Sequence, residues 1–465
     1  MSGTNKWRVG MGSALVLCGL LSGAWADAAP QREARPARQI EGVARLEGFR
    51  DIPFVLQGDG GTQPVVVVVN YLSEADMDGF AGDARQAVGV PRTDPRYFWR
   101  LLAGRVVAQG MSVLRYNALG IGCQPVEAVP VRKVDADGHE QTPFCAHDED
   151  SARIEPRHYV DALASVLVAA RERLAVPRLP VILVAHSGNS RVVADFVQSG
   201  AAQASGVDVV GWVGIAPLLS TGAEALRQQH GGWALSKIAA CPADDWQPCA
   251  LAVLDSLPGQ GLLPVADWKA LIASAGGDRD LAMSRLAEAA NEAFLRARNG
   301  LEASLGSGRL GRSGAGLLIR EGTAADMLVG GQAPAAGLQA VPASAIFLGG
   351  NDYLLTPELQ QKAWLSAGGQ LGQIHVLEGL GHTLSHEPLA GAMSEQALSA
   401  VTAALARMAR ADAPVHPHGT RPPRARPAAL GTVEALGKGS DGTLKPTGKS
   451  QVAVRSRPSR PGTQP

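Results

Sequence analysis

Three residues of this chain, Ser187, Asp352 and His382, have the types needed for nucleophilic catalysis. Ser187 comes directly after the apolar run 179–186, and the other two each follow a later apolar run. A serine hydroxyl is nearly inert near neutral pH, so it needs a histidine base and a carboxylate that orients the base. Since each residue follows a predicted strand, we expect the three side chains to meet at one edge of a sheet. The alternative for Asp352 and His382 is an ordinary place in a turn or loop.

The sequence around the serine is Ala185-His-Ser-Gly-Asn189, and helical spacing follows over 191–198. A buried strand, a sharp turn at a serine and then a helix form the context of a nucleophile elbow. Such a turn exposes the hydroxyl, and the helix N-terminus directs backbone N–H groups towards an oxyanion formed there. Asn189 stands where the pattern has a second glycine, and a serine after a strand is also typical of a helix cap. His186 is expected to pack beside the turn.

The elements that must position these residues form an alternating series. Apolar runs predict strands at 64–69, 111–116, 179–186, 207–215, 343–348 and 373–377, with one or two edge strands within 40–57. Helical spacing predicts helices at 96–109, 156–175, 191–198, 357–367 and 388–410, and a hairpin is predicted between 129–134 and 141–144. This alternation requires right-handed crossovers and predicts an α/β fold, with a mostly parallel sheet and helices on both faces.

A long stretch from 218 to 341 interrupts the series. The strand pattern disappears there, and helical pieces are predicted at 224–229, 266–274 and 281–299. We interpret the stretch as a helical cap inserted between a first core part, 27–217, and a second core part, 342–410. Its tryptophans, Trp233, Trp246 and Trp268, either line a substrate pocket or form the core of the cap.

Several motifs, taken together, resemble those of the α/β-hydrolase fold serine hydrolases, the superfamily of esterases and lipases. They are A-H-S-G-N at 185–189, G-G-N-D-x-x-x-x-P at 349–357, G-x-G-H at 379–382 and the turn sequence 114–122. The resemblance extends from about residue 50 to residue 410. It implies that Ser187 attacks a carbonyl carbon, that His382 takes and returns the proton, and that Asp352 holds the imidazole tautomer.

The resemblance also implies an oxyanion hole. Its first donor would be the N–H of Gly188, directly after the nucleophile. The second donor comes from the loop after Val69, where the family usually has His-Gly. This chain has Asn70-Tyr71-Leu72 there, so the N–H of Tyr71 or Leu72 is the expected donor.

The two ends of the chain predict export and disorder. Lys6 and Arg8, the apolar run 11–21 and the sequence Ala24-Trp-Ala26 are typical of a secretory signal peptide over 1–26. The mature protein is therefore expected to be periplasmic or secreted; the alternative is lipid attachment at Cys18. Residues 411–465 are rich in proline and arginine and lack apolar periodicity, which predicts a disordered tail. A tether to anions of the cell envelope is the functional alternative for that tail.

Removal of the signal peptide leaves four cysteines, Cys123, Cys145, Cys241 and Cys249. In an oxidising compartment an even number of cysteines favours disulfides, and two local pairs favour Cys123–Cys145 and Cys241–Cys249. Free buried thiols are the alternative. No pair has C-x-x-C spacing, so zinc or redox chemistry is not expected.

The sequence gives little indication of other partners or of cofactors. The formal net charge is zero, which gives no reason to expect nucleic acid as a partner. No run after the signal peptide approaches the roughly 18 apolar residues of a spanning helix. The G-x-G-x-x-G sequence at 306–311 follows a predicted helix rather than a strand, so it does not predict a dinucleotide site. His382 and His386 have i,i+4 spacing without an adjacent glutamate, so neither a metal nor an organic cofactor is expected.

The sequence as a whole predicts an exported serine hydrolase that cleaves an ester or another acyl bond of a small molecule through an acyl-enzyme. Two other functions stay open. One is a peptidase or acyltransferase on the same fold, and the other is a catalytically silent binding protein of the cell envelope. The departures at Asn189 and at Asn70-Tyr71 keep the silent alternative open, and the sequence does not address the oligomeric state.

Overall fold

The computed structural model describes residues 38–58, 63–70, 77–79, 93–122, 133–134, 140–141, 146–147, 153–256, 263–305, 310–312, 318–320, 323, 325–326, 331–388 and 391–411. The chain divides into two units, Met1–Val415 and His416–Pro465, and every described residue lies in the first. The predicted signal peptide lies outside the described residues, as does the predicted tail apart from Ala411.

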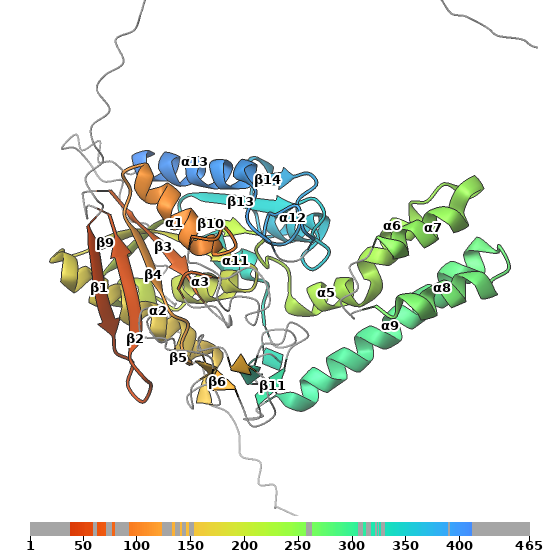
Figure 1. Cartoon of the computed structure of the whole chain (residues 1–465), viewed down its shortest axis with the longest axis horizontal. Helices are drawn as coiled ribbons and strands as arrows, with labels where there is room; N and C mark the ends of the chain where they lie inside the picture. The colour runs from red at the N-terminus through yellow and green to blue at the C-terminus, as the bar shows by residue number, and fades with distance from the viewer. Residues whose placement is uncertain are drawn as a thin grey trace, which may run out of the picture. The chain divides into compact units, whose positions relative to one another are not determined.

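An eight-stranded sheet forms the centre of this unit (Figure 1). Its strands, in order across the sheet, are β1 (Gln39–Ala44), β2 (Ile52–Gln57), β4 (Val113–Tyr116), β3 (Val65–Val69), β9 (Leu179–His186), β10 (Val207–Ile215), β13 (Ser344–Gly349) and β14 (Ile374–Leu377). From β4 to β14 each strand is parallel to the next one across the sheet, whereas β2 is antiparallel to both β1 and β4. The predicted α/β fold with a mostly parallel sheet is therefore confirmed.

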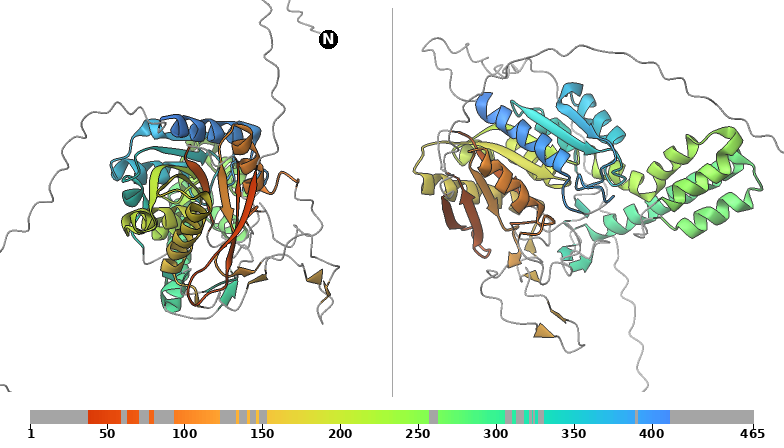
Figure 2. Two further views of the ribbon diagram at one scale, coloured as in Figure 1. Left: turned by 90° about the vertical axis from the view of Figure 1, so that its left-hand side faces the viewer. Right: turned by 45° about the horizontal axis from the view of Figure 1, so that its top comes forward.

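Helices cover both faces of the sheet (Figure 2). They are α1 (Phe98–Ala108), α2 (Pro156–Leu174), α3 (Asn189–Gln198), α4 (Ala201–Ala204), α11 (Pro334–Leu338), α12 (Pro357–Ser366) and α13 (Glu395–Ala411). Successive residues of a strand point to opposite faces. Within β3, Val65, Val67 and Val69 join the core under α2 and α3, while Val66 and Val68 join the core under α1 and α13. Burial on both faces explains why β3 is a continuous valine run rather than an alternating one.

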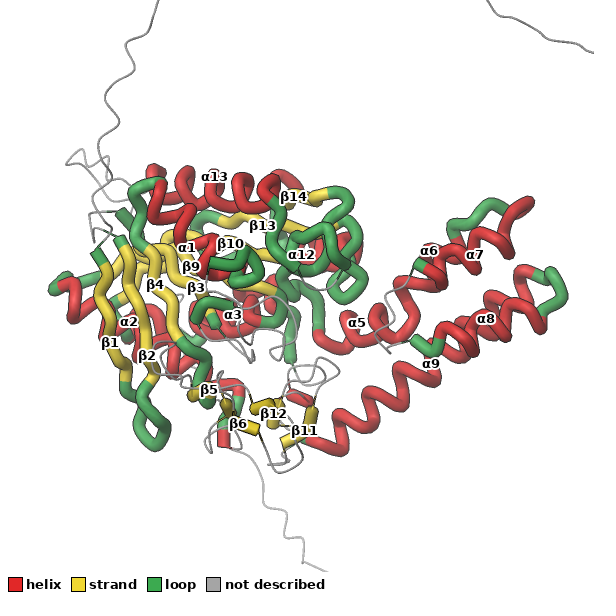
Figure 3. Tube along the Cα trace, in the orientation of Figure 1, coloured by secondary structure: helices red, strands yellow, loops and turns green. Residues whose placement is uncertain are grey.

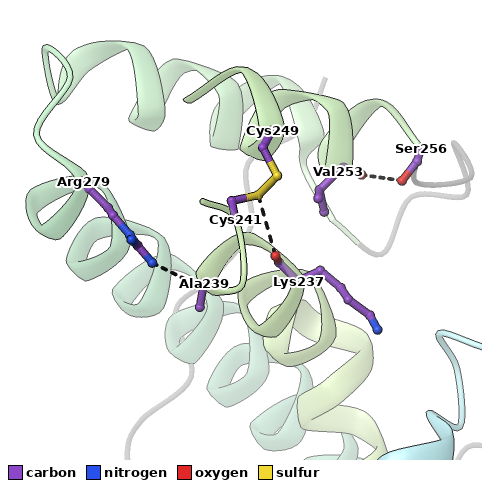
Figure 4. Close-up of a disulfide and its surroundings, with 7 residues drawn as sticks. All are labelled: Lys237, Ala239, Cys241, Cys249, Val253, Ser256 and Arg279. Carbon is purple, nitrogen blue, oxygen red and sulfur yellow. Dashed lines mark hydrogen bonds between the residues drawn. A yellow bond between two sulfur atoms is a disulfide. The ribbon is translucent and has the colours of Figure 1, made fainter. Parts of the chain in front are cut away.

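The chain between β10 and β13 contains a helical insertion with a core of its own. Its elements are α5 (Gly222–Arg227), η4 (Gln228–Gly232), α6 (Trp233–Ala239), η5 (Ala243–Asp245), α7 (Trp246–Asp255), α8 (Val265–Ser274) and α9 (Arg279–Ser304). Trp246 and Trp268 are buried in this core, so the core alternative holds for these two tryptophans. Cys241 and Cys249 form a disulfide that links the segments on either side of η5 (Figure 4). The other predicted pair, Cys123 and Cys145, lies outside the described residues.

The insertion differs from its sequence prediction in two respects. Helices α6 and α7 were not predicted, because their apolar residues come in short pieces that are broken at Pro242. The expected absence of strands was wrong, since β11 (Leu310–Arg312) and β12 (Leu318–Arg320) pair antiparallel (Figure 3). Each has only three residues, too few to show a period in the sequence.

Short elements complete the description. The two-residue strands β5 (Ile121–Gly122) and β8 (Ala146–His147) pair antiparallel, and so do β6 (Lys133–Val134) and β7 (Glu140–Gln141) in the region of the predicted hairpin. A 3₁₀ turn, η7 (Leu371–Gln373), precedes β14. The last helix was predicted from residue 388 but begins at Glu395, because the carbonyl of Pro388 instead accepts the N–H of His382.

Candidate active site

Ser187 lies in a strained turn between β9 and α3. Its φ is +54°, a left-handed value that non-glycine residues rarely adopt. Hydrogen bonds hold the turn: the Ser187 N–H donates to the Ile215 carbonyl at 3.0 Å, and the Ser187 carbonyl accepts from the Leu218 N–H at 3.0 Å and the Ser190 hydroxyl at 2.8 Å. The residue that caps α3 is Gly188 rather than Ser187. The geometry is thus that of an elbow that presents the serine hydroxyl.

The three predicted side chains meet at this turn. Nε2 of His382 lies 3.0 Å from Oγ of Ser187, and Nδ1 of His382 lies 2.8 Å from Oδ2 of Asp352. Both distances are within hydrogen-bond range. Asp352 is fully buried and His382 is 7% exposed, which shields the pair from water. The arrangement can pass a proton from the serine to the histidine while the carboxylate holds the other ring nitrogen.

The Asp352 carboxylate is held by backbone groups of its own loop. Its Oδ1 accepts the N–H groups of Leu354 and Leu355 at 2.9 and 3.0 Å. Oδ1 is therefore occupied, and Oδ2 is left to face Nδ1 of His382. This orientation favours the imidazole tautomer that carries its proton on Nδ1, so that Nε2 accepts the serine proton.

Glycines let the aspartate loop and the histidine loop approach each other. A Cβ at Gly349 would lie 2.2 Å from the Gly381 carbonyl oxygen and 2.5 Å from that of Leu380. A Cβ at Gly381 would lie 2.3 Å from the carbonyl oxygen of Glu387. The two loops are joined directly, since the Asn351 N–H donates to the Leu380 carbonyl at 2.8 Å. Gly349 therefore allows the two loops to approach, and Gly381 allows the histidine loop to fold back on itself.

His186, directly before the nucleophile, contacts the histidine of the site. Its Nε2 lies 3.1 Å from the His382 carbonyl oxygen, which can only accept, so this nitrogen carries a proton. The two rings lie 4.7 Å apart, and the Phe98 ring meets His186 edge-on at 5.6 Å. Burial lowers the pKa of His186 to about 3, and the charge of His382 adds to this effect. His186 therefore packs beside the elbow, as the sequence predicts, and also holds the backbone of His382.

The lowered pKa of His186 predicts a pH dependence of stability. In the unfolded chain this histidine titrates near pH 6.5, whereas the folded protein protonates it only near pH 3. Between these values the unfolded state binds one more proton, so stability falls as the pH falls, by about 1.4 kcal/mol per pH unit. His186→Phe removes this contribution, so the loss of stability between pH 6.5 and pH 4 becomes shallower. Urea unfolding at several pH values measures it.

The control for this prediction is His386→Gln, because His386 is exposed. That variant is expected to keep the slope of the unmodified protein. Parallel stability curves for His186→Phe and the unmodified protein would show that His186 does not carry the effect.

Of the predicted oxyanion donors, the structure describes Gly188. Gly188 lies between Ser187 and the first residue of α3, as an elbow donor requires. Tyr71 and Leu72 lie outside the described residues. The strand before them is described to its end, where Nδ2 of Asn189 donates to the Val69 carbonyl at 3.0 Å. This contact was not predicted from the sequence, where its only signal was an amide side chain at a position where the elbow pattern has glycine.

The helical insertion contacts the loop that carries Asp352. Nε2 of Gln229 donates to the Leu354 carbonyl at 3.1 Å, and the rings of Trp233 and Tyr353 lie 6.2 Å apart. Trp233 is only partly buried in the core of the insertion. Of the three tryptophans, it is therefore the one that lies against the loop of the site.

The described residues offer little for a metal or a membrane. They contain no group of three or more histidine, cysteine or acidic side chains that could hold a metal ion. His386 is exposed, while His382 is engaged by Ser187 and Asp352. Within the same residues, none of the helices has the combination of length and apolar character that a bilayer crossing needs. The glycine motif at 306–311 lies mostly outside the described residues.

Comparison with known proteins finds similarity at the level of structure. No protein-family model and no curated protein matches the sequence. The match to a putative hydrolase from Agrobacterium vitis S4 covers 81% of this chain and 100% of the hydrolase chain, with 11% identity and a TM-score of 0.37. The match to a structure reported with carboxylesterases of Nitrososphaera gargenis covers 80% of this chain and 100% of the other, with 11% identity and a TM-score of 0.41. The match to a thermophilic esterase from Thermogutta terrifontis covers 80% of this chain and 100% of the esterase chain, with 13% identity and a TM-score of 0.36. Since these values are low, the site rests on its own contacts.

Proposed function

We propose that this chain, whose fold is that of the α/β-hydrolases, is a serine hydrolase that cleaves an ester or a related acyl bond through an acyl-enzyme. The observation that carries the proposal is the position of His382, 3.0 Å from the Ser187 hydroxyl and 2.8 Å from the Asp352 carboxylate. A serine whose φ is +54° supports it further, because such strain persists mainly where the surrounding structure fixes a functional conformation.

In the proposed reaction Ser187 Oγ attacks the acyl carbon while Nε2 of His382 takes the hydroxyl proton. The new C–O bond converts the carbonyl into a tetrahedral oxyanion, and the proton then passes from His382 to the leaving alcohol as the old bond breaks. In the second half, water attacks the acyl carbon while His382 takes its proton. The bond between the acyl carbon and Ser187 Oγ then breaks, His382 returns the proton to the serine, and the carboxylic acid leaves. Asp352 stays ionised and stabilises the imidazolium that forms in each half.

The oxyanion is proposed to be stabilised by the Gly188 N–H and by an N–H of the loop after Val69, from Tyr71 or Leu72. One such donor is worth about 10²–10³ in kcat. The chain's own side chains and backbone are sufficient for this chemistry, which needs no metal or organic cofactor.

We also propose that the substrate is a small acyl compound and that the protein acts outside the cytoplasm. The signal-peptide pattern over 1–26 supports export. The segment 218–341 is proposed as a cap that limits access to the serine. Its contact with the Asp352 loop, through Gln229 and Trp233, supports this role.

Burst kinetics with p-nitrophenyl esters of increasing acyl length test the proposal. An acyl-enzyme predicts a burst of nitrophenol close to one equivalent per protein, followed by slower turnover. Ser187→Ala should abolish both phases, and Ser399→Ala, on an exposed position of α13, should leave them unchanged. Hydrolysis of peptides but not esters would favour the peptidase alternative. A folded protein that hydrolyses neither esters nor peptides would favour the silent binding protein and overturn the proposal.

A further inference from the structure

We propose that Asn189 is a positioning residue that ties the nucleophile turn to the end of β3 and so holds the Gly188 oxyanion donor in place relative to the sheet. This inference rests on the proposed function. It concerns a residue that departs from the elbow pattern, since the pattern has glycine at this position. The departure was a reason to keep the silent alternative open, whereas its contacts give it a part in the site.

The first part of the argument is the place of Asn189 itself. It is the first residue of α3, so its backbone is fixed next to Gly188 and two residues from Ser187. Its side chain is 8% exposed, and Nδ2 donates to the Val69 carbonyl at 3.0 Å. Val69 is the last residue of β3. One side chain thus links the turn that carries the Gly188 donor to the end of β3.

The second part concerns the peptide unit that receives this bond. The Val69 carbonyl and the Asn70 N–H belong to the same planar unit. Asn189 holds its carbonyl side, and the hydroxyl oxygen of Tyr116 accepts its N–H at 3.2 Å. The unit is therefore fixed from both sides, by α3 and by β4. Rotation of this peptide would break both bonds.

Tyr116 also holds the residue that follows. Its hydroxyl donates to the Asn70 carbonyl at 3.3 Å, and Nδ2 of Asn70 donates to the Tyr116 carbonyl at 3.3 Å. Asn70 is 2% exposed and Tyr116 is 1% exposed, so these bonds do not compete with bulk water. The end of β3 and the residue that follows it are therefore held by buried hydrogen bonds, which gives Asn189 a fixed partner.

The third part is the chemistry that needs this rigidity. Oxyanion donors act because they are held in place before the negative charge develops. They contribute to the transition state and little to the bound ester, so a displaced donor lowers kcat rather than raising KM. The loss of a residue that is merely structural would lower the stability of the fold without lowering kcat at an unchanged KM.

The test uses Asn189→Asp, which keeps the size but removes the donor, and Asn189→Gly, which restores the pattern and introduces no charge. We expect either change to lower kcat for p-nitrophenyl esters about 10- to 100-fold, which is less than the effect of removing a whole donor. KM should stay within about twofold of the value of the unmodified protein. Affinity for an alkyl boronate, whose adduct with Ser187 mimics the tetrahedral intermediate, should fall by the same factor as kcat.

Asn291→Asp, at an exposed position of α9, is the matched control and should leave kcat, KM and boronate affinity unchanged. Thermal unfolding identifies a variant that has lost its fold. If Asn189→Asp does not fold, the kinetics and boronate affinity of Asn189→Gly decide the test. Variants that keep kcat and boronate affinity, or that change only KM, would overturn the inference while the ester activity of the unmodified protein upholds the proposed function. An inactive, unmodified protein would overturn both.

Discussion

Replacing Asp352 with asparagine is expected to lower kcat by about 10⁴-fold while the fold stays intact. The amide has nearly the shape of the carboxylate, and its oxygen can still accept the N–H groups of Leu354 and Leu355. Its NH₂ group then faces Nδ1 of His382, which must become the acceptor. The proton moves to Nε2, the nitrogen 3.0 Å from Ser187, and the base can no longer take the serine proton. Steady-state kinetics with a p-nitrophenyl ester measures the loss.

Asp161→Asn is the matched control, because Asp161 is exposed on α2. It should keep the activity of the unmodified protein. If Asp352→Asn retains more than about a tenth of kcat while its thermal unfolding is unchanged, Asp352 does not orient the base, and the proposed role of the 2.8 Å contact is wrong.

Gly349→Ala is expected to have the second large effect, on both stability and activity. Its Cβ would lie 2.2 Å from the Gly381 carbonyl oxygen, a backbone atom that no side-chain rotation can move away. Such overpacking costs about 1–3 kcal/mol, and we expect a value near the upper end. The histidine loop must shift to relieve the collision, and a displacement of about 1 Å can lower the rate about 10²-fold. Chemical denaturation and ester kinetics measure the two effects.

Gly372→Ala serves as the control for this substitution. Gly372 lies in η7, shortly before β14, and a Cβ there meets no atom within 4 Å. Unchanged stability and activity are expected. A Gly349→Ala protein that is as stable and active as the Gly372→Ala protein would show that the two loops tolerate separation.

The parts of the fold that the sequence predicts well are those determined by local pattern. The valine run of β3 predicted a central buried strand, and the three strands before Ser187, Asp352 and His382 were each visible as apolar runs. Parallel strands bring their carboxyl ends to one edge, so the meeting of the three side chains followed from their positions along the chain.

The features that the sequence did not predict depend on contacts between distant segments. The bond from Asn189 to Val69 spans 120 residues and has no local pattern. The contact of His186 with the His382 carbonyl is equally remote, at 196 residues. The late start of α13 has the same cause, because the chain after residue 388 helps to hold the histidine loop before it becomes helical.

Covalent labelling by a fluorophosphonate is the measurement that tests the central claim most directly. The phosphorus is attacked only by a serine hydroxyl that a neighbouring base activates, and fluoride leaves. The account predicts one adduct per mature protein, located on Ser187 by peptide mass mapping, lost in Ser187→Ala and retained in Ser399→Ala. A folded protein that stays unlabelled, or that is labelled at another residue, would contradict it.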